Sequence, residues 1–156
     1  MTAHWTILVC GDPARGDDGV GLAVADRLAG SGCADARIRR VGQLQAEDLI
    51  AALAHGPCIV VDAVRGVEPG RVVELPLGQL ASASSEIVPA STHALPVDVT
   101  VRLAEALGAN VELGTFVGVG GRSFELGAGL SPEAAHGIDA AATAIERRLV
   151  APRGAA

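Results

Sequence analysis

Hydrophobic and polar positions along the chain follow two spacings, one typical of strands and one typical of helices. Continuous or alternating apolar runs predict strands at residues 5–10, 36–41, 58–62, 70–75 and 111–119. Apolar residues at helical spacing predict helices at residues 20–29, 47–54, 96–107 and 132–149. Strands that take turns with helices are typical of an α/β domain with a mostly parallel sheet. We therefore expect a three-layer αβα arrangement around a twisted sheet of about five strands.

Three segments carry further detail about the sheet. Residues 58–62 are almost wholly apolar, which is typical of a central strand. Residues 70–75 alternate between apolar and polar positions and are bounded by Gly and Pro, which indicates an edge strand. Residues 82–92 are polar and predict a loop.

Two helices have clear boundary signals. Pro96 suits the first turn of a helix that continues through Val99, Leu103 and Leu107. Ser131 is a predicted cap for the last helix, because serine before a proline and an acid is a common start.

Composition limits the possible partners. The chain has 156 residues, 49% hydrophobic and 19% charged, enough for one real core and too apolar for a disordered chain. We expect residues 1–150 to form a single domain and residues 151–156 to form a flexible tail. The 12 Lys and Arg against 18 Asp and Glu give a net charge of −6, with 2% aromatic residues. The chain therefore lacks the basic patch and stacking rings of nucleic-acid binding.

Membrane and secretion signals are also lacking in the sequence. No apolar run approaches the ~20 residues of a membrane span, and the amino terminus has no basic region of a signal peptide. Cys10, Cys33 and Cys58 do not have a zinc-like spacing. Cys10 and Cys58 lie in apolar strands, where free thiols are usually buried. We expect no membrane partner and a reducing, cytoplasmic location.

A glycine-rich turn follows the first strand, where many α/β proteins have a phosphate-binding loop. Gly11 and Gly16 have the spacing of such a loop, but Asp17 and Asp18 follow where lysine and serine or threonine are needed. Two carboxylates at a helix start repel phosphate, so charge excludes the nucleotide-binding hypothesis. The turn instead presents acidic groups, and an isolated Asp at this position is most often a helix cap.

Gly19 and Gly21 favour a role beyond capping. Glycine in the first turns of a helix costs about 1 kcal/mol relative to alanine. That cost is understandable where another backbone or a substrate must approach closely. The adjacent Asp17 and Asp18 point about 100° apart on a helix. One of them can therefore cap the helix or face solvent while the other faces a cleft.

Asp62 and His93 complete the candidate site. Asp62 closes the predicted central strand, and ligands of open α/β sheets bind outside such strand ends, although a turn or cap role is equally open. His93 lies in the polar segment before the helix at 96–107, and the topology returns this segment to the same edge. With Asp18 they would form a set of two carboxylates and an imidazole. Such a set suits a first-row divalent metal, or histidine acid–base catalysis with carboxylate help.

These residues lie in blocks that resemble the hydrogenase maturation endopeptidases. The first block holds a strand, the acidic pair and a Gly-x-Gly before a helix, and the blocks follow the family's order at residues 7–28, 43–56, 58–64, 91–97 and 124–149. The resemblance implies a cytoplasmic peptidase of the aspartyl-endopeptidase type with a phosphorylase/hydrolase-like fold. Its implied partner is the large-subunit precursor of a nickel–iron hydrogenase, from which it removes a carboxy-terminal extension after nickel insertion.

The resemblance also implies the roles of individual residues. Asp18, Asp62 and His93 correspond to the family's catalytic and metal-contacting triad. The nickel is presented by the substrate, so no tightly bound cofactor is expected, although other divalent ions can occupy the site. Asp17 then has the lesser role, and Asp17→Asn is expected to be milder than a change at Asp18. Asp12 stands where the family commonly has Asn, and Asp18 is one methylene shorter than the Glu of some members.

Two alternative functions stay open at this point. Besides precursor processing, the alternatives are a self-contained divalent-metal peptidase or amidohydrolase, and a non-catalytic metal-sensing maturation chaperone. Proteolysis of a nickel-loaded precursor distinguishes the three hypotheses, because only precursor processing requires nickel in the substrate.

Overall fold

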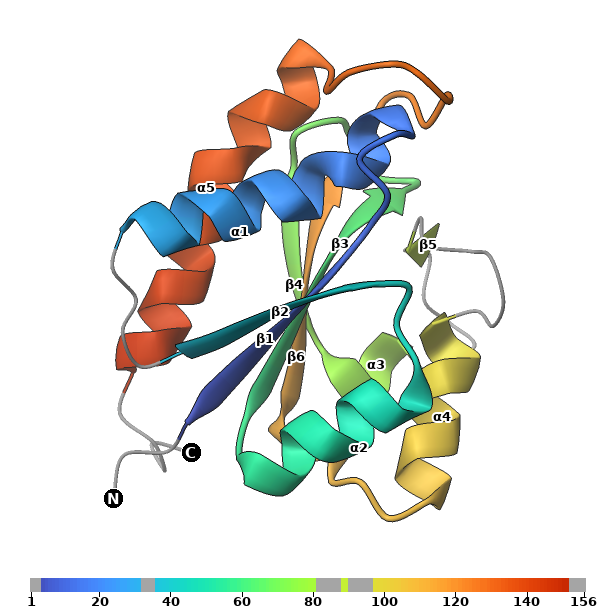
Figure 1. The fold of residues 1–156 in the computed structure, drawn as a ribbon, viewed down its shortest axis with the longest axis vertical. Helices are drawn as coiled ribbons and strands as arrows, with labels where there is room; N and C mark the ends of the chain where they lie inside the picture. Colours follow the sequence, from blue (N-terminus) through green and yellow to red (C-terminus); the bar gives the residue numbers. More distant parts are fainter. Residues whose placement is uncertain (1–3, 32–35, 81–87, 90–96, 152–156) are drawn as a thin grey trace.

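The computed structural model describes residues 4–31, 36–80, 88–89 and 97–151 (Figure 1). The elements in chain order are β1 (Trp5–Cys10), the 3₁₀ turn η1 (Gly16–Gly19), α1 (Val20–Gly30), β2 (Ala36–Gly42), α2 (Ala46–His55), β3 (Cys58–Arg65), β4 (Val72–Pro76), α3 (Leu77–Leu80), β5 (Val88–Pro89), α4 (Val97–Ala106), the 3₁₀ turn η2 (Val111–Leu113), β6 (Gly114–Gly120) and α5 (Pro132–Val150). No helix in these ranges has the length and apolar composition needed to cross a membrane.

A mostly parallel sheet organises the domain. Five strands follow the order β2-β1-β3-β6-β4, and the short β5 pairs with the end of β3. β1 runs parallel to β2 and β3, and β3 runs parallel to β6, whereas β4 is antiparallel to β6. The predicted fold class and the predicted edge position of β4 are confirmed.

Helices cover both faces of this sheet (Figure 1). α1 and α5 pack on one face, and α2, α3 and α4 pack on the other. Successive side chains of a strand point to opposite faces, so Val60 of β3 packs in the layer of α2 and α4, while Val61 packs against α1 and α5. The expected three-layer arrangement is therefore present, with one apolar core on each side of the sheet.

The strand order creates a switch point between β1 and β3. The chain leaves β1 through α1 to reach β2 on one side, and later returns through α2 to β3 on the other. Val9 pairs with Val61, so Cys10, the last residue of β1, is level with Asp62. The prediction that Asp62 closes its strand is wrong, because pairing of β3 with β6 continues to Val64 and extends the strand. The switch point is where open α/β sheets bind ligands.

The predicted helix around 96–107 forms, but it buries a different face. Leu103 and Leu107 are 42% and 63% exposed. The buried side chains of α4 include Thr100 and Ala104, whose small size lets the helix pack closely against α2 and α3.

Two other segments differ from the sequence prediction. Residues 111–113 form the turn η2 instead of a strand, because the Asn110 side chain accepts a hydrogen bond from the Glu112 backbone N–H (3.2 Å) and closes a turn. Val88–Pro89 pair with β3 within the stretch predicted as a loop. The other residues of 82–92 lie outside the described part of the chain.

Candidate functional site

The turn after β1 holds the first acidic residue of the site. Gly11 adopts φ +129°, and a Cβ there would lie 2.0 Å from the Asp18 carbonyl oxygen. Only glycine lets the turn fold back this closely. Asp18 is consequently buried, and its Oδ2 atom accepts a hydrogen bond from the Asp12 backbone N–H (2.9 Å). The carboxylate is held in place by the turn that carries it.

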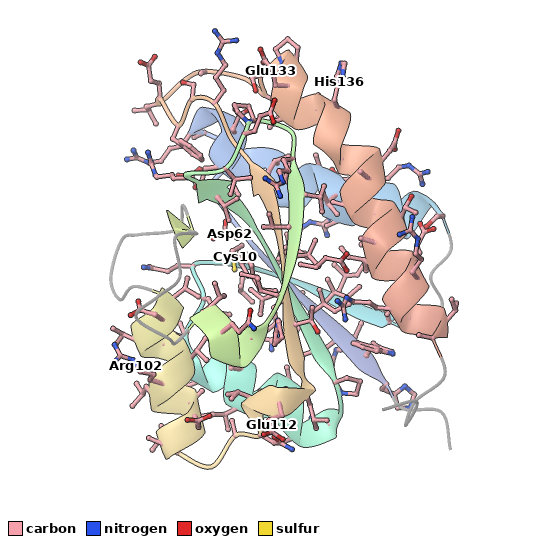
Figure 2. The ribbon with its side chains drawn as sticks, turned by 180° about the vertical axis from the view of Figure 1, so that it is seen from behind. Cys10, Asp62, Arg102, Glu112, Glu133 and His136 are labelled. Carbon is pink, nitrogen blue, oxygen red and sulfur yellow. The ribbon has the colours of Figure 1, made fainter. Side chains whose placement is uncertain are left out.

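Asp62 presents the second buried carboxylate. Its side chain has no solvent exposure, and Oδ1 accepts a hydrogen bond from the Ala63 backbone N–H (2.8 Å). It lies on the α2 and α4 side of the sheet, near Cys10 of the neighbouring strand (Figure 2). A charged group in such a place costs free energy unless it is compensated, and this is typical of functional sites.

Burial and nearby negative charge both keep the Cys10 thiol protonated. Burial raises the pKa of Cys10 well above its usual value, and the charges of Asp62, Asp48 and Asp18 raise it further. Burial likewise raises the pKa of Cys58 to about 12, which the charge of Arg39 only partly offsets. Both cysteines are free and buried, as the sequence predicted. Neither thiol is a thiolate nucleophile at neutral pH.

His93, the third predicted residue, lies outside the described residues. α4 begins four positions later, at Val97, and packs on the face of the sheet that carries the Asp62 side chain (Figure 1). Within the described ranges, no three His, Cys, Asp or Glu side chains are grouped closely enough to hold a metal ion. The structure therefore brings Asp18 and Asp62 to one end of the sheet, and a metal centre there needs a donor from elsewhere.

Asp17 neither faces solvent nor caps the helix, contrary to the sequence-based interpretation. It is fully buried, and its oxygens accept four hydrogen bonds, from the backbone N–H groups of Arg122 (2.7 Å), Ser123 (3.2 Å) and Ser131 (2.7 Å) and from the Ser131 hydroxyl (2.7 Å). Burial raises the pKa of Asp17, but the hydrogen bonds from Ser131, Arg122 and Ser123 more than offset it and lower the pKa overall. Asp17 thus joins the turn after β1 to residues 121–131.

These two loops form one unit at the end of the sheet. The Gly127 backbone N–H donates to the Ala14 carbonyl (2.8 Å), and that of Gly16 donates to the Ala128 carbonyl (3.1 Å). Ser131 also caps α5 as predicted, since its hydroxyl accepts from the Ala134 backbone N–H (3.1 Å). The loop that carries Asp18 is therefore supported by a segment more than a hundred positions away.

Gly21 allows α1 to lie directly on the sheet beneath the site. A Cβ at this position would be 2.8 Å from the Cys10 carbonyl oxygen and 3.5 Å from that of Val61. The predicted close backbone approach is confirmed. At Gly30, in the same helix, no described heavy atom outside the helix's own backbone lies within 4 Å of an added Cβ.

This contrast gives a matched test of packing under the site. We expect Gly21→Ala to lower the free energy of unfolding by about 2 kcal/mol, because the added methyl overlaps backbone that cannot move aside. Gly30→Ala should raise it by about 0.5 kcal/mol, because it only restricts the unfolded chain. Urea unfolding measures both values. Equal effects at the two positions would contradict the close packing of α1.

Solved structures share this fold. The chain resembles the NiFe hydrogenase maturation protease HybD from Thermococcus kodakarensis, with a TM-score of 0.73 and 23% identity over 94% of this chain and 99% of that one. For the hydrogenase maturating endopeptidase HybD from E. coli, the TM-score is 0.73 and the identity 20%, over 94% and 91%. The NiFe hydrogenase maturation protease HycI from Thermococcus kodakarensis KOD1 has a TM-score of 0.69 and 25% identity, over 94% of this chain and 92% of that one. A search of curated protein sequences gives no match.

The chain thus has the α/β fold of these solved structures, with two buried carboxylates at its switch point. A family model described as HycI, hydrogenase maturation protease, matches residues 42–148, which is well over half of the chain. The chain belongs to the hydrogenase maturation protease family, as the sequence resemblance implied, and it is a hydrolase that cleaves peptide bonds.

Proposed function

We propose that this protease removes the carboxy-terminal extension of a nickel–iron hydrogenase large-subunit precursor, and that it recognises the nickel carried by that substrate. The observation that carries the proposal is the pair of buried carboxylates, Asp18 and Asp62, near the Cys10 thiol at the switch point. Two negative charges in a water-poor site repel each other, and a cation in the substrate relieves that repulsion. A precursor without its metal lacks this attraction.

Both carboxylates are oriented before the substrate arrives. Asp18 is fixed through Oδ2 by the Asp12 N–H, and Asp62 is fixed through Oδ1 by the Ala63 N–H. Orientation of this kind saves the entropy of ordering the groups during the reaction. With His93 as the third member, oxygen and nitrogen donors of this chain suit a first-row divalent ion such as nickel.

Water is the nucleophile in this proposal. The buried, protonated Cys10 thiol is unsuited to attack, so the carbonyl carbon of the scissile peptide gains its oxygen from water. The carbon–nitrogen bond breaks and the departing amine takes up a proton. Asp18, Asp62 and His93 hold the water molecule close to the scissile peptide. Because two of these three residues are aspartates, we describe the protease as an aspartyl-type endopeptidase. A bound divalent ion acts as a Lewis acid toward a carbonyl or water.

The cellular setting belongs to the same proposal. The buried cysteines Cys10 and Cys58 are free thiols, which fits the reducing conditions of the cytoplasm. The metal arrives with the partner and does not belong to the protease. We therefore expect no tightly held cofactor, although nickel, zinc or cadmium at high concentration can occupy the carboxylates.

Processing of matched precursor samples tests the proposal. We expect the nickel-loaded precursor to be cleaved and the nickel-free precursor to remain intact, with the products identified by mass spectrometry. The protease should be dialysed against chelator first, and it should keep both its melting temperature and its activity. Asp18, Asp62 and His93 are three donors without a fourth, which leaves open coordination positions and weak binding of a free ion, and a core of this size needs no metal to fold.

The other outcomes point to the rival functions. Cleavage of nickel-free precursor, lost after chelation and restored by added metal, would identify a self-contained metallopeptidase. Binding of the nickel-loaded precursor without any cleavage would identify a metal-sensing chaperone. Either result would overturn the proposal.

A further inference from the structure

A hollow lies at the opposite end of β1 from Asp18. Its volume is about 560 Å³, within the range of ligand sites. The residues around it include Thr6 of β1, Arg37 and Arg39 of β2, and Ala51, Ala52 and His55 of α2. The hollow exists because α2 packs over β1 and β3 and presents alanines toward the face of β2.

The hollow is cationic although the chain is acidic overall. β2 carries Arg37, Arg39 and Arg40, against a net charge of −6 for the whole chain. Arg39 pairs with Asp48 (3.4 Å) and Arg40 pairs with Asp26. For Arg37, no carboxylate of the described residues lies within the 4.0 Å of an ion pair. Arg37 lines the hollow and is exposed, so a negatively charged ligand can reach it without displacing a carboxylate of the described residues.

The same residues follow an open edge of the sheet. β2 is the outermost strand on its side in the described part of the chain, with β1 as its one neighbour. Thr6 pairs with Arg37 and Leu8 pairs with Arg39, which places both arginines on the face of the sheet that α2 covers. The outer side of β2 therefore offers backbone donors and acceptors beside a cationic hollow.

We propose that β2 binds an extended acidic peptide of a partner protein, which adds to the sheet as a further strand and sets a carboxylate against Arg37. Main-chain hydrogen bonds along an edge strand supply affinity, and alternate side chains supply specificity. An acid opposite Arg37 gains a cross-strand pair of opposite charge, and the planar guanidinium binds a carboxylate through two parallel hydrogen bonds. The hollow accommodates the acidic side chain. The proposal is independent of the peptidase reaction.

A labelled peptide of alternating valine and aspartate tests this binding with the full-length protein. Fluorescence anisotropy should show saturable binding, and Arg37→Gln should weaken it about tenfold, the loss expected for one charge-assisted pair. Arg102→Gln is the matched control, since Arg102 is an exposed arginine on α4 far from β2, and it should bind as the unmodified protein does. A peptide with asparagine in place of aspartate should also bind about tenfold more weakly.

A second pair of peptides tests strand addition itself. Methyl groups on alternate backbone nitrogens remove the donors of one edge, and the methylated acidic peptide should lose its binding. The absence of binding at about 1 mM peptide would overturn the proposal. Equal binding to Arg37→Gln, or equal binding of the methylated peptide, would also overturn it. If replacement of the β2 arginines increases aggregation and the protein binds no peptide, the arginines only protect the sheet edge from pairing with other chains, and the proposal is wrong.

Discussion

Asp62→Asn is expected to lower precursor processing at least about 100-fold while leaving the melting temperature unchanged or slightly raised. The carboxylate is fully buried, and Asn keeps the oxygen that accepts the Ala63 N–H while removing the negative charge. Removal of a buried charge relieves a desolvation cost, so the substitution should stabilise the fold slightly while it slows processing. Processing is measured with nickel-loaded precursor, and stability by thermal unfolding.

Asp26→Asn is the matched control for this change. Asp26 is an exposed carboxylate on α1 that pairs with Arg40, so its loss should change processing and stability little. Normal processing by Asp62→Asn would exclude Asp62 from the site. A large loss of stability would show that the carboxylate is structural, which would equally contradict the proposed function.

Asp17 should produce the largest loss of stability of any single acidic residue in the site region. Asp17→Ala leaves three backbone N–H groups and the Ser131 hydroxyl without their acceptor, at a cost of about 3 kcal/mol or more. Asp17→Asn should lower the free energy of unfolding by about 2 kcal/mol, because the NH₂ group of asparagine would face N–H and O–H donors that need an acceptor. Processing should fall too, because the turn that carries Asp18 loses its support. That Asp17→Asn is milder for processing than a change at Asp18 stays a prediction, and the four hydrogen bonds add a stability cost that the sequence does not show.

The pH dependence provides a separate readout for Asp17. Its pKa is lower in the folded protein than the 3.8 of an unperturbed aspartate. Its contribution to stability is therefore complete above that value and is lost as pH falls through the folded pKa. The difference between the parent protein and Asp17→Asn, measured by urea unfolding, should be constant near neutral pH and shrink below about pH 4. Asp139→Asn, at an exposed position, is the control variant for the same measurement. A difference that grows in acid would contradict the role assigned to Asp17.

Local patterns were sufficient to predict most of the fold. The predicted boundaries of β1 agree with the structure, because an uninterrupted apolar run and a glycine turn are local signals. The cap at Ser131 was found for the same reason. The buried face of α4 was not predicted, because the neighbours of a helix decide which of its sides is covered. Nothing in the local sequence around Leu103 indicates that this side chain is exposed.

The candidate site divides along the same line. The shared location of Asp18 and Asp62 was predictable because parallel strands bring their carboxyl ends to one edge, a rule that needs no knowledge of side-chain contacts, and their role stays a prediction. The role of Asp17 depends on Ser131, 114 positions away, and no local pattern reports such a partner. His93 stays a prediction from its place before α4 and from the family resemblance.

The late position of β6 in the chain has a consequence for synthesis on the ribosome. β6 lies between β3 and β4, and the loop after it supplies the partners of Asp17. A nascent chain that ends before residue 114 can pair β1, β2 and β3, but it lacks the strand that joins β4 to the sheet. The acidic turn is likewise unsupported until residues 121–131 emerge. The candidate site therefore forms only when almost all of these residues have been made. Truncated products contain Asp18 and Asp62 but lack the folded site.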